Sequence, residues 1–259
     1  NVITAGIDSN SQLKTIKKFK RNNELKKTIF LIPDENYKDE IEKSINFTKI
    51  KIKKKYIYDN EPTKLTKQVE KITNYKRRKQ NLEDEIKRIE NSDENNKEKK
   101  IEKLKKKYTL GKVNFDSIII ADFDESLKSV TTSLLYTDVS PKEKFFITLN
   151  QWFDETLLEE TSIQPIYFPS INLENYEEFK NNYSKNFKDN PSHIAFLTYD
   201  IVGLVYYLAY KNNFIIDDKI FKNKNVFKGK VGIFEIENNN ITHQLNFYKI
   251  DNRKFKKIF

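Results

Sequence analysis

Short apolar stretches alternate with longer amphipathic ones along the first two thirds of the chain. The stretches 28–32, 117–121 and 145–149 are almost entirely apolar, which is typical of strands buried on both faces of a sheet. Segments of about 10 to 15 residues with helical periodicity separate them, and this alternation predicts an α/β fold with a mostly parallel sheet. The strands predicted in this way lie at 1–7, 28–32, 50–58, 117–121, 145–149 and 166–168.

The segment 63–107 interrupts this rhythm because it is long, helical in pattern and highly charged. Apolar residues spaced by three or four positions form three stripes, and the polar run 91–96 separates the last two. One apolar residue per turn is too few for a deep core. We therefore predict a helical hairpin that projects from the domain, with its two arms burying each other. The facing residues are expected to be Leu82, Ile86 and Ile89 on one arm and Ile101 and Leu104 on the other.

The last third of the chain changes character. A helical pattern begins at Tyr176, and a second, apolar helix is predicted over 193–210, where Asp200 and Gly203 argue for a buried helix rather than a membrane span. Alternating segments at 231–237 and 241–250 flank three asparagines, which predicts a β-hairpin. The predicted divisions are an α/β lobe at 1–165 with a hairpin insertion at about 63–110, a helical segment at 166–230, and a terminal hairpin at 231–259.

Composition narrows the possible functions. Nineteen Phe and fourteen Tyr supply material for a core, and the absence of Cys excludes disulfides and thiolate chemistry. The formal charge of +10 raises nucleic acid as a partner. Residues 63–107 carry most of that excess, however, as Lys alternating with Glu, without the Arg forks and interleaved aromatics of nucleic-acid readers. We therefore expect no nucleic-acid partner.

Candidate binding residues follow the ends of the predicted strands, where open α/β sheets place their ligands. Asp at such a junction more often caps a helix, and a tryptophan beside a helix start is more often a packed ring. His193 and His243 have no metal-binding spacing, and both are expected at the surface. No phosphate-binding glycine loop is present, so we expect no cofactor, no metal and no catalysis. The candidates for a ligand-facing cleft are Tyr37, Asp122, Phe123, Asp124, Asn150 and Trp152.

Several short segments, taken in order, resemble a known family. Residues 31–37, Leu-Ile-Pro-Asp-Glu-Asn-Tyr, are similar to its strand-end motif Pro-Asp-x-x-Tyr-Gly, and Trp152 and Asp154 fall where the family has a Gly-x-x-x-Trp-Asp-like segment. Lys38 and Asn150 depart from it, because glycine is usual there. The chain resembles the penicillin-binding protein activators, a group within the type I periplasmic-binding superfamily. Further segments that carry the resemblance are 6–12, 108–111, 115–120, 134–139, 197–200 and 227–234.

The resemblance implies a periplasmic regulator without catalysis, whose partner is a peptidoglycan synthase. By this resemblance, the second lobe would consist of residues 1–165. The chain would return to the first lobe over residues 166–230, and the terminal segment 231–259 would close the second lobe. The alternative is a solute-binding protein of an ABC transporter. In amino-acid-binding relatives an aromatic at the position resembling Tyr37 covers the ligand, and polar groups near Asn150 hold its amine. The family's first ~100 residues have no counterpart here, so we expect an outer-membrane lipoprotein anchor to lie outside this chain.

Overall fold

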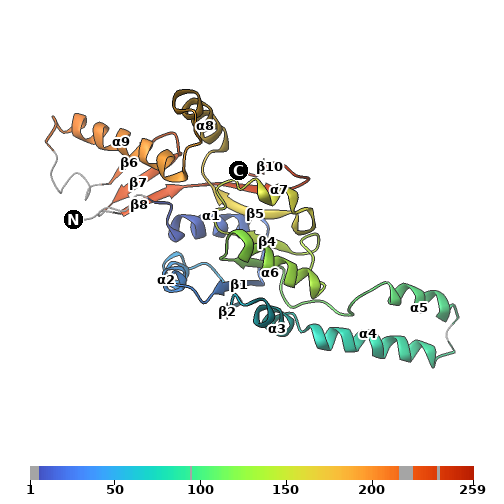
Figure 1. The fold of residues 1–259 in the computed structure, drawn as a ribbon. Helices are drawn as coiled ribbons and strands as arrows, with labels where there is room; N and C mark the ends of the chain where they lie inside the picture. Colours follow the sequence, from blue (N-terminus) through green and yellow to red (C-terminus); the bar gives the residue numbers. More distant parts are fainter. Residues whose placement is uncertain (1–5, 94, 216–223, 238–239) are drawn as a thin grey trace.

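The computed structural model describes residues 6–93, 95–215, 224–237 and 240–259. Its centre is a seven-stranded sheet in the order β10-β9-β5-β4-β3-β1-β2, in which β1 to β5 run parallel and the last two strands antiparallel (Figure 1). The parallel order 2-1-3-4-5 is a common doubly wound arrangement. Its strands are β1 (Thr28–Pro33), β2 (Lys54–Tyr58), β3 (Ser117–Ile120), β4 (Phe145–Thr148), β5 (Ile166–Ser170), β9 (Asn246–Ile250) and β10 (Phe255–Lys257).

Helices cover both faces of this sheet, which explains why β1 and β3 are apolar at every position. Alternate residues of each strand belong to different core clusters. One face packs against α1 (Ser9–Asn22) and α2 (Lys38–Thr48), and the other against α3 (Pro62–Ile72) and α6 (Asp124–Tyr136). The predicted α/β class and mostly parallel sheet are confirmed. Of the strand predicted at 1–7, residues 1–5 lie outside the described residues, and Gly6 and Ile7 form no strand.

A smaller antiparallel sheet lies beside the large one, in the order β6-β7-β8. Its strands are β6 (Asn225–Lys228), β7 (Ile233–Glu237) and β8 (Asn240–Gln244). α8 (Leu173–Phe187) precedes it, and α9 (His193–Lys211) packs on it through Leu204 and Leu208. Residues 238 and 239 of the predicted asparagine turn lie outside the described residues.

The predicted strand at 241–250 is divided between the two sheets. β8 pairs with β7, whereas β9 pairs antiparallel with β5 in the large sheet. Phe247 and Tyr248 are consecutive and both fully buried, one in each core cluster, so β9 is a strand buried on both faces. The antiparallel pair at the edge of the large sheet is therefore β9 with β10, not the hairpin of 231–250.

The prediction that 193–210 is a buried helix is wrong. α9 turns one narrow stripe inward and exposes a broad apolar face, on which Val202 is 63% and Tyr206 65% exposed. By length and composition α9 is also apolar enough to cross a membrane. Asp200 argues for its place in the folded domain, because its buried carboxylate accepts the backbone N–H groups of Lys230 and Val231 at 2.8 and 2.6 Å.

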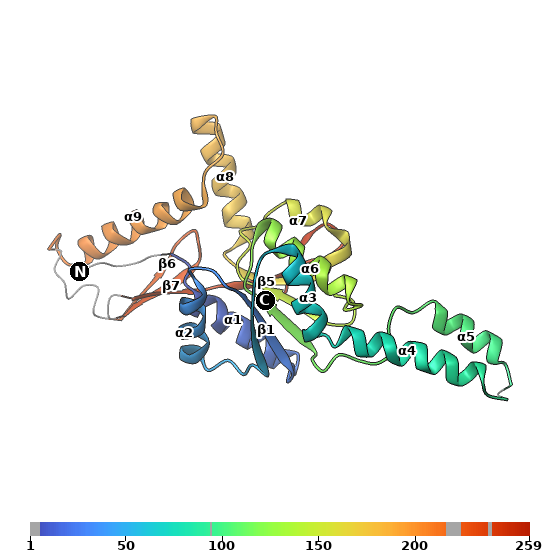
Figure 2. The same ribbon diagram turned by 60° about the horizontal axis from the view of Figure 1, so that its bottom comes forward.

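The charged region forms three helices, of which only two project. α3 packs on α6 and belongs to the lobe, with Leu65 and Val69 in its core. α4 (Tyr75–Glu90) and α5 (Lys97–Lys105) contact each other and extend away from the sheet (Figures 1 and 2). We call residues 75–107 the arm. Leu82 and Ile89 are buried on α4, and Ile101 and Leu104 are half-buried on α5.

Arg78 fixes the base of the arm to the lobe. Its guanidinium donates to the carbonyls of Gly111, Thr137 and Asp138 and to Thr109 Oγ1, at 2.7 to 3.1 Å. The two chains of the arm also meet there, because the Leu110 N–H donates to the Arg78 carbonyl at 2.9 Å. Thr109 in turn donates to the Asp138 carboxylate. The arm is therefore attached by a buried polar network rather than by a flexible linker.

Candidate functional site

A cleft of ≈ 830 Å³ opens at the carboxyl edge of the large sheet. Its floor is the loop that follows β4, and one wall is the beginning of α6, which follows β3. The opposite wall comes from α8 and from His193 at the start of α9. The cleft is therefore bounded by segments that are distant in sequence, and strand ends supply the side on which ligands bind in open α/β sheets.

The loop after β4 is held by buried amides. The Asn150 N–H donates to Gln12 Oε1 at 2.8 Å, and Gln151 Nε2 donates to the carbonyls of Asp122 and Leu149. Asn150 Oδ1 accepts the Trp152 N–H at 3.0 Å and the Ser170 hydroxyl at 2.8 Å. Because Oδ1 accepts from a backbone N–H, the orientation of the Asn150 amide is fixed.

The same orientation leaves Asn150 Nδ2 without a hydrogen-bond partner among the described residues. The side chain is only 3% exposed and belongs to the lining of the cleft. An unpaired buried amide donor costs about 1 to 3 kcal/mol. Asn150 thus holds an unpaired, buried donor at a position that lines the cleft.

Trp152 and Phe153 have positive φ, at 48° and 56°, which costs a bulky residue about 1 to 2 kcal/mol each. The Phe153 ring is buried among Phe168, Tyr248 and Phe255, and this packing offsets the strain. The Trp152 ring instead lies in the cleft and stacks on His193, with centroids 4.6 Å apart and planes 10° apart. His193 is exposed as a residue, but its ring is partly covered by Trp152, and this partial burial lowers the pKa of His193 below its ordinary 6.5.

Asp122 and Tyr37 lie behind the cleft rather than in its lining. The buried Asp122 carboxylate accepts the Tyr58 hydroxyl at 2.5 Å, the Ser126 hydroxyl at 2.6 Å and the Phe123 N–H at 2.9 Å. Burial, with the Asp122 charge beside it, raises the pKa of Tyr58. The Tyr37 hydroxyl donates to the Ala121 carbonyl at 3.2 Å, and burial raises its pKa as well. Both side chains are committed to the protein itself.

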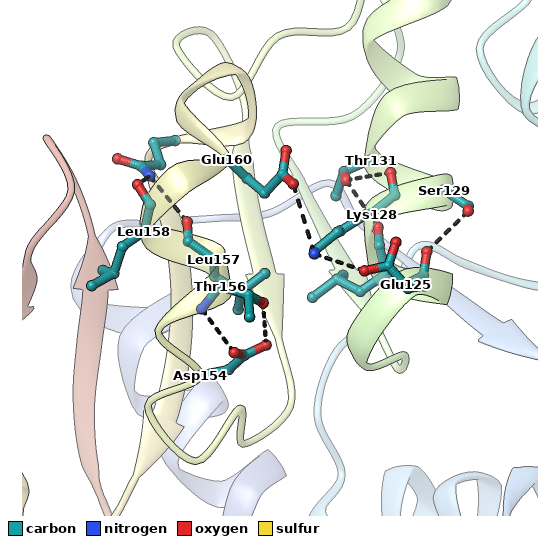
Figure 3. A network of polar contacts seen from close by, with 11 residues as sticks. Glu125, Lys128, Ser129, Thr131, Asp154, Thr156, Leu157, Leu158 and Glu160 are labelled. Carbon is teal, nitrogen blue, oxygen red and sulfur yellow. Dashed lines mark hydrogen bonds and ion pairs between the residues drawn. The ribbon is translucent and has the colours of Figure 1, made fainter.

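The rim of the cleft is acidic, but Lys180 in its lining and Lys128 beside it neutralise part of the charge. Glu125 pairs with Lys128 at 2.8 Å, and Lys128 also lies 3.7 Å from Glu160 (Figure 3). Asp154 lies just before α7 (Thr156–Glu159) and accepts the N–H and the hydroxyl of Thr156 (Figure 3). Lys180 lies 3.4 Å from Glu155. In the described part of the chain, no group of three or more His, Asp and Glu could hold a metal ion.

The structure brings four of the six candidate residues together in the cleft lining: Phe123, Asp124, Asn150 and Trp152. Sequence reasoning missed the wall formed by Tyr176, Glu177, Lys180 and His193, since nothing in the local pattern of α8 and α9 indicates that they face the β4 loop. His193 is exposed, as expected. The expectation for His243 is wrong: it is only 7% exposed, because β8 lies against α1 and the His243 N–H donates to Ser11 Oγ.

Comparisons with known proteins identify the fold. No family model matches the sequence, and no curated protein matches it significantly. Solved structures do match, at low identity. A branched-chain amino acid ABC transporter periplasmic ligand-binding protein from Burkholderia xenovorans has a TM-score of 0.59 at 8% identity over 99% of this chain and 64% of its own. An extracellular ligand-binding receptor from Desulfohalobium retbaense has a TM-score of 0.59 at 10% identity over 98% and 40%.

A third solved structure is of another kind. The C-domain of LpoA from Haemophilus influenzae, a regulator of PBP1A, has a TM-score of 0.51 at 10% identity, covering 98% of this chain and 68% of its own. The chain thus spans 40 to 68% of the length of these three structures. It has the fold of the type I periplasmic-binding proteins, which both solute-binding proteins and a penicillin-binding protein regulator share.

Proposed function

We propose that this chain is part of a non-enzymatic, periplasmic regulator that acts through contact with a peptidoglycan synthase. The observation that carries the proposal is the arm, which projects from the lobe and is fixed at its base by Arg78. A clamshell that closes on a small solute has no evident use for such a projection. A helical pair held at a defined angle presents a large polar surface to another protein.

The contacts of Trp152, in the cleft, and of Asp122, behind it, support the same proposal. The Trp152 ring is stacked on His193, and the Asp122 carboxylate is fully engaged by Tyr58, Ser126 and Phe123. These two side chains therefore already have partners inside the protein, whereas Asn150 Nδ2 does not. An outer-membrane lipoprotein anchor would hold such a regulator near its partner.

The test uses the peptidoglycan synthase of the same organism. We expect the protein to bind the synthase in a pull-down and to raise its rate of glycan polymerisation, and a variant lacking 79–106 to lose both effects. The matched control is Trp152→Ala, which changes the cleft and leaves the arm intact; it should bind and stimulate normally. The proposal is wrong if the intact protein neither binds nor stimulates. The role of the arm is wrong if the shortened variant acts like the intact one.

The alternative, solute binding, rests on the unpaired donor of Asn150. Asn150→Asp keeps the oxygen that holds the loop but replaces the free donor with a negative charge. A solute-binding site at this position would show micromolar affinity for a small ligand, and the substitution would abolish that affinity.

Calorimetry with a panel of amino acids separates the two functions. Burying a zwitterion requires partners for both charged ends. Lys180 is the one Lys or Arg among the residues that line the described cleft, and it lies beside Glu155. We therefore expect no amino acid to bind more tightly than about millimolar, or roughly −4 kcal/mol. Micromolar binding would contradict the regulator and favour the solute-binding protein.

A further inference from the structure

A second concave surface, the basic groove, lies at the edge of the sheet opposite the cleft. It is formed by the last half of α1, by the turn that precedes β1 and by the turn between α2 and β2, and it encloses ≈ 580 Å³. Because these segments come before parallel strands, they gather at the amino edge, whereas the cleft lies at the carboxyl edge.

The charge of this groove is one-sided. Eight Lys and Arg side chains line it against a single acidic residue, Glu24. Of the described residues, no carboxylate forms an ion pair with any of the eight. The carboxylate of Asp116 is nearby, but it accepts the backbone N–H groups of Lys26 and Lys27. Six of the eight cations are Lys14, Lys18, Arg21, Lys26, Lys49 and Lys51.

The other two cations, Lys17 and Lys20, give the groove its shape. Lys17 Nζ donates to the Thr48 carbonyl at 2.8 Å, and Lys20 Nζ donates to the Lys51 carbonyl. These bonds join α1 to the end of α2. Lys20 is only 5% exposed, and burial lowers its pKa to about 8. Lys18 is held over the Phe259 ring, 4.3 Å from its centroid.

Ordinary helix-end stabilisation does not account for this charge. The ends of α1 and α2 contribute about half a negative charge each, and Glu24 contributes one more. The Asp116 carboxylate beside Lys20 contributes another negative charge, so about five positive charges remain uncompensated. Like charges held at close distance repel one another, and a bound anion would relieve that repulsion.

We propose that the basic groove binds an anionic ligand that carries phosphate groups. A single carboxylate needs one or two cations, whereas this surface offers several, as the compact point charges that lysines supply to phosphates. The groove contains one Arg, so it lacks the paired forks that read nucleic-acid bases. The phosphate can belong to a lipid headgroup or to a soluble phosphate compound. This proposal is independent of the function assigned to the arm.

The experiment measures binding to two probes, with the full chain. The first is cosedimentation with vesicles of phosphatidylglycerol and phosphatidylcholine, compared with phosphatidylcholine alone. The second is inorganic phosphate and pyrophosphate at millimolar concentration, followed by NMR. The variant Lys18→Glu/Arg21→Glu/Lys49→Glu reverses three exposed charges in the groove. We expect it to lose at least about tenfold in affinity for whichever probe binds.

The matched control is Lys76→Glu/Arg77→Glu/Lys79→Glu on the exposed face of α4, which changes the formal charge by the same amount. It should bind within about twofold of the unchanged protein if the groove is the site. Binding to vesicles alone identifies a lipid headgroup, and binding to soluble phosphate as well identifies the phosphate itself; both support the proposal. Equal loss in the two variants, or no binding to either probe, overturns it. Circular dichroism of both variants confirms that each is folded.

Discussion

Arg78 shows how one side chain connects two parts of the molecule. It is only 7% exposed, and each of its guanidinium nitrogens donates to an oxygen of the segments 109–111 or 137–138. Two of those acceptors, the Thr137 carbonyl and Thr109 Oγ1, are buried and have no water to replace the arginine, whereas Gly111 and Asp138 are exposed residues. Arg78 therefore contributes to stability mainly because its removal would leave these buried acceptors without a hydrogen-bond donor.

We predict that Arg78→Ala lowers the free energy of unfolding by about 2 to 4 kcal/mol, because it leaves the buried Thr137 carbonyl and Thr109 hydroxyl without their donor. Urea denaturation measures the change. Arg77→Ala, on the adjacent exposed position, should change the free energy by no more than about 0.5 kcal/mol. An equally small effect at Arg78 would mean that the network does not hold the arm.

His193 and Trp152 offer a spectroscopic test of the cleft, because Trp152 is the chain's single tryptophan. Burial lowers the pKa of His193, so its folded-state value lies below 6.5. The stabilisation from the neutral ring is thus present above 6.5 and is lost as the pH falls through the lower value. Glu155, Glu177 and Lys180 line the same cleft.

Tryptophan emission should therefore change on acidification, with a midpoint below 6.5, as the imidazole becomes charged beneath the indole. His193→Gln should remove this transition and leave the emission independent of pH in that range. A midpoint at or above 6.5 would contradict the partial burial of the imidazole, and a transition that persists in the variant would show that His193 does not cause it.

The sequence predicted that the polar candidates lie together at the strand ends. It did not predict which of their side chains face the cleft. Strand ends were visible in the sequence, so Asp122, Asp124 and Asn150 were expected at one edge. The Asp122 carboxylate turns inward to the Tyr58 hydroxyl, which is 64 positions away in the sequence. Local patterns do not contain such pairings.

At the scale of elements, the arm behaves as a unit that is separate from the sheet. Its apolar residues lie between α4 and α5, and neither helix contributes to the main core clusters of the described residues. The Leu110 N–H bonds to the Arg78 carbonyl, so the chain enters and leaves the arm at adjacent points. A short linker can therefore replace it.

Deleting 79–106 across a short Gly-Ser linker should leave the lobe folded, with Arg78 and its acceptors retained. The thermal unfolding midpoint should shift by only a few degrees, since the removed residues mainly bury each other. Circular dichroism and tryptophan emission provide the measurement. Loss of cooperative unfolding would show that the arm is part of the core.

Elements with strong periodicity were predicted well, and those whose partners lie elsewhere were not. The buried strands β1, β3 and β4 were evident because both of their faces are apolar. The alternation across 241–250 gave no sign that the chain changes sheets at Leu245, since β8 and β9 have similar patterns. α9 is apolar throughout, which indicates burial in a complete core; composition does not reveal which face is covered.

For the whole molecule, the two edges of the large sheet differ in charge. The cleft at the carboxyl edge is lined by five acidic residues and one lysine, and the amino edge carries the basic groove. The arm leaves and re-enters the lobe at the amino edge, because it lies between the end of α3 and the start of β3. The functions proposed for the arm and for the basic groove therefore both belong to one end of the molecule.

The outward face of α9 determines whether copies of this chain associate in solution. Ile194, Val202 and Tyr206 line an apolar groove of ≈ 1040 Å³ between α8 and α9. The apolar faces of two copies of the chain can bury each other. The net charge of +10 opposes that association at low ionic strength. Added salt screens the charge and leaves the apolar attraction, so salt should lower the solubility of the protein rather than raise it.

We expect sedimentation velocity to show oligomers that grow with protein concentration and with salt. The double substitution Val202→Glu/Tyr206→Glu should restore a monomer and reduce the binding of an apolar fluorescent dye. The control Phe47→Glu/Tyr108→Glu, at exposed positions far from α9, should associate like the unchanged chain. If that control disperses the oligomers equally well, charge alone governs the association, and the face of α9 has no special part in it.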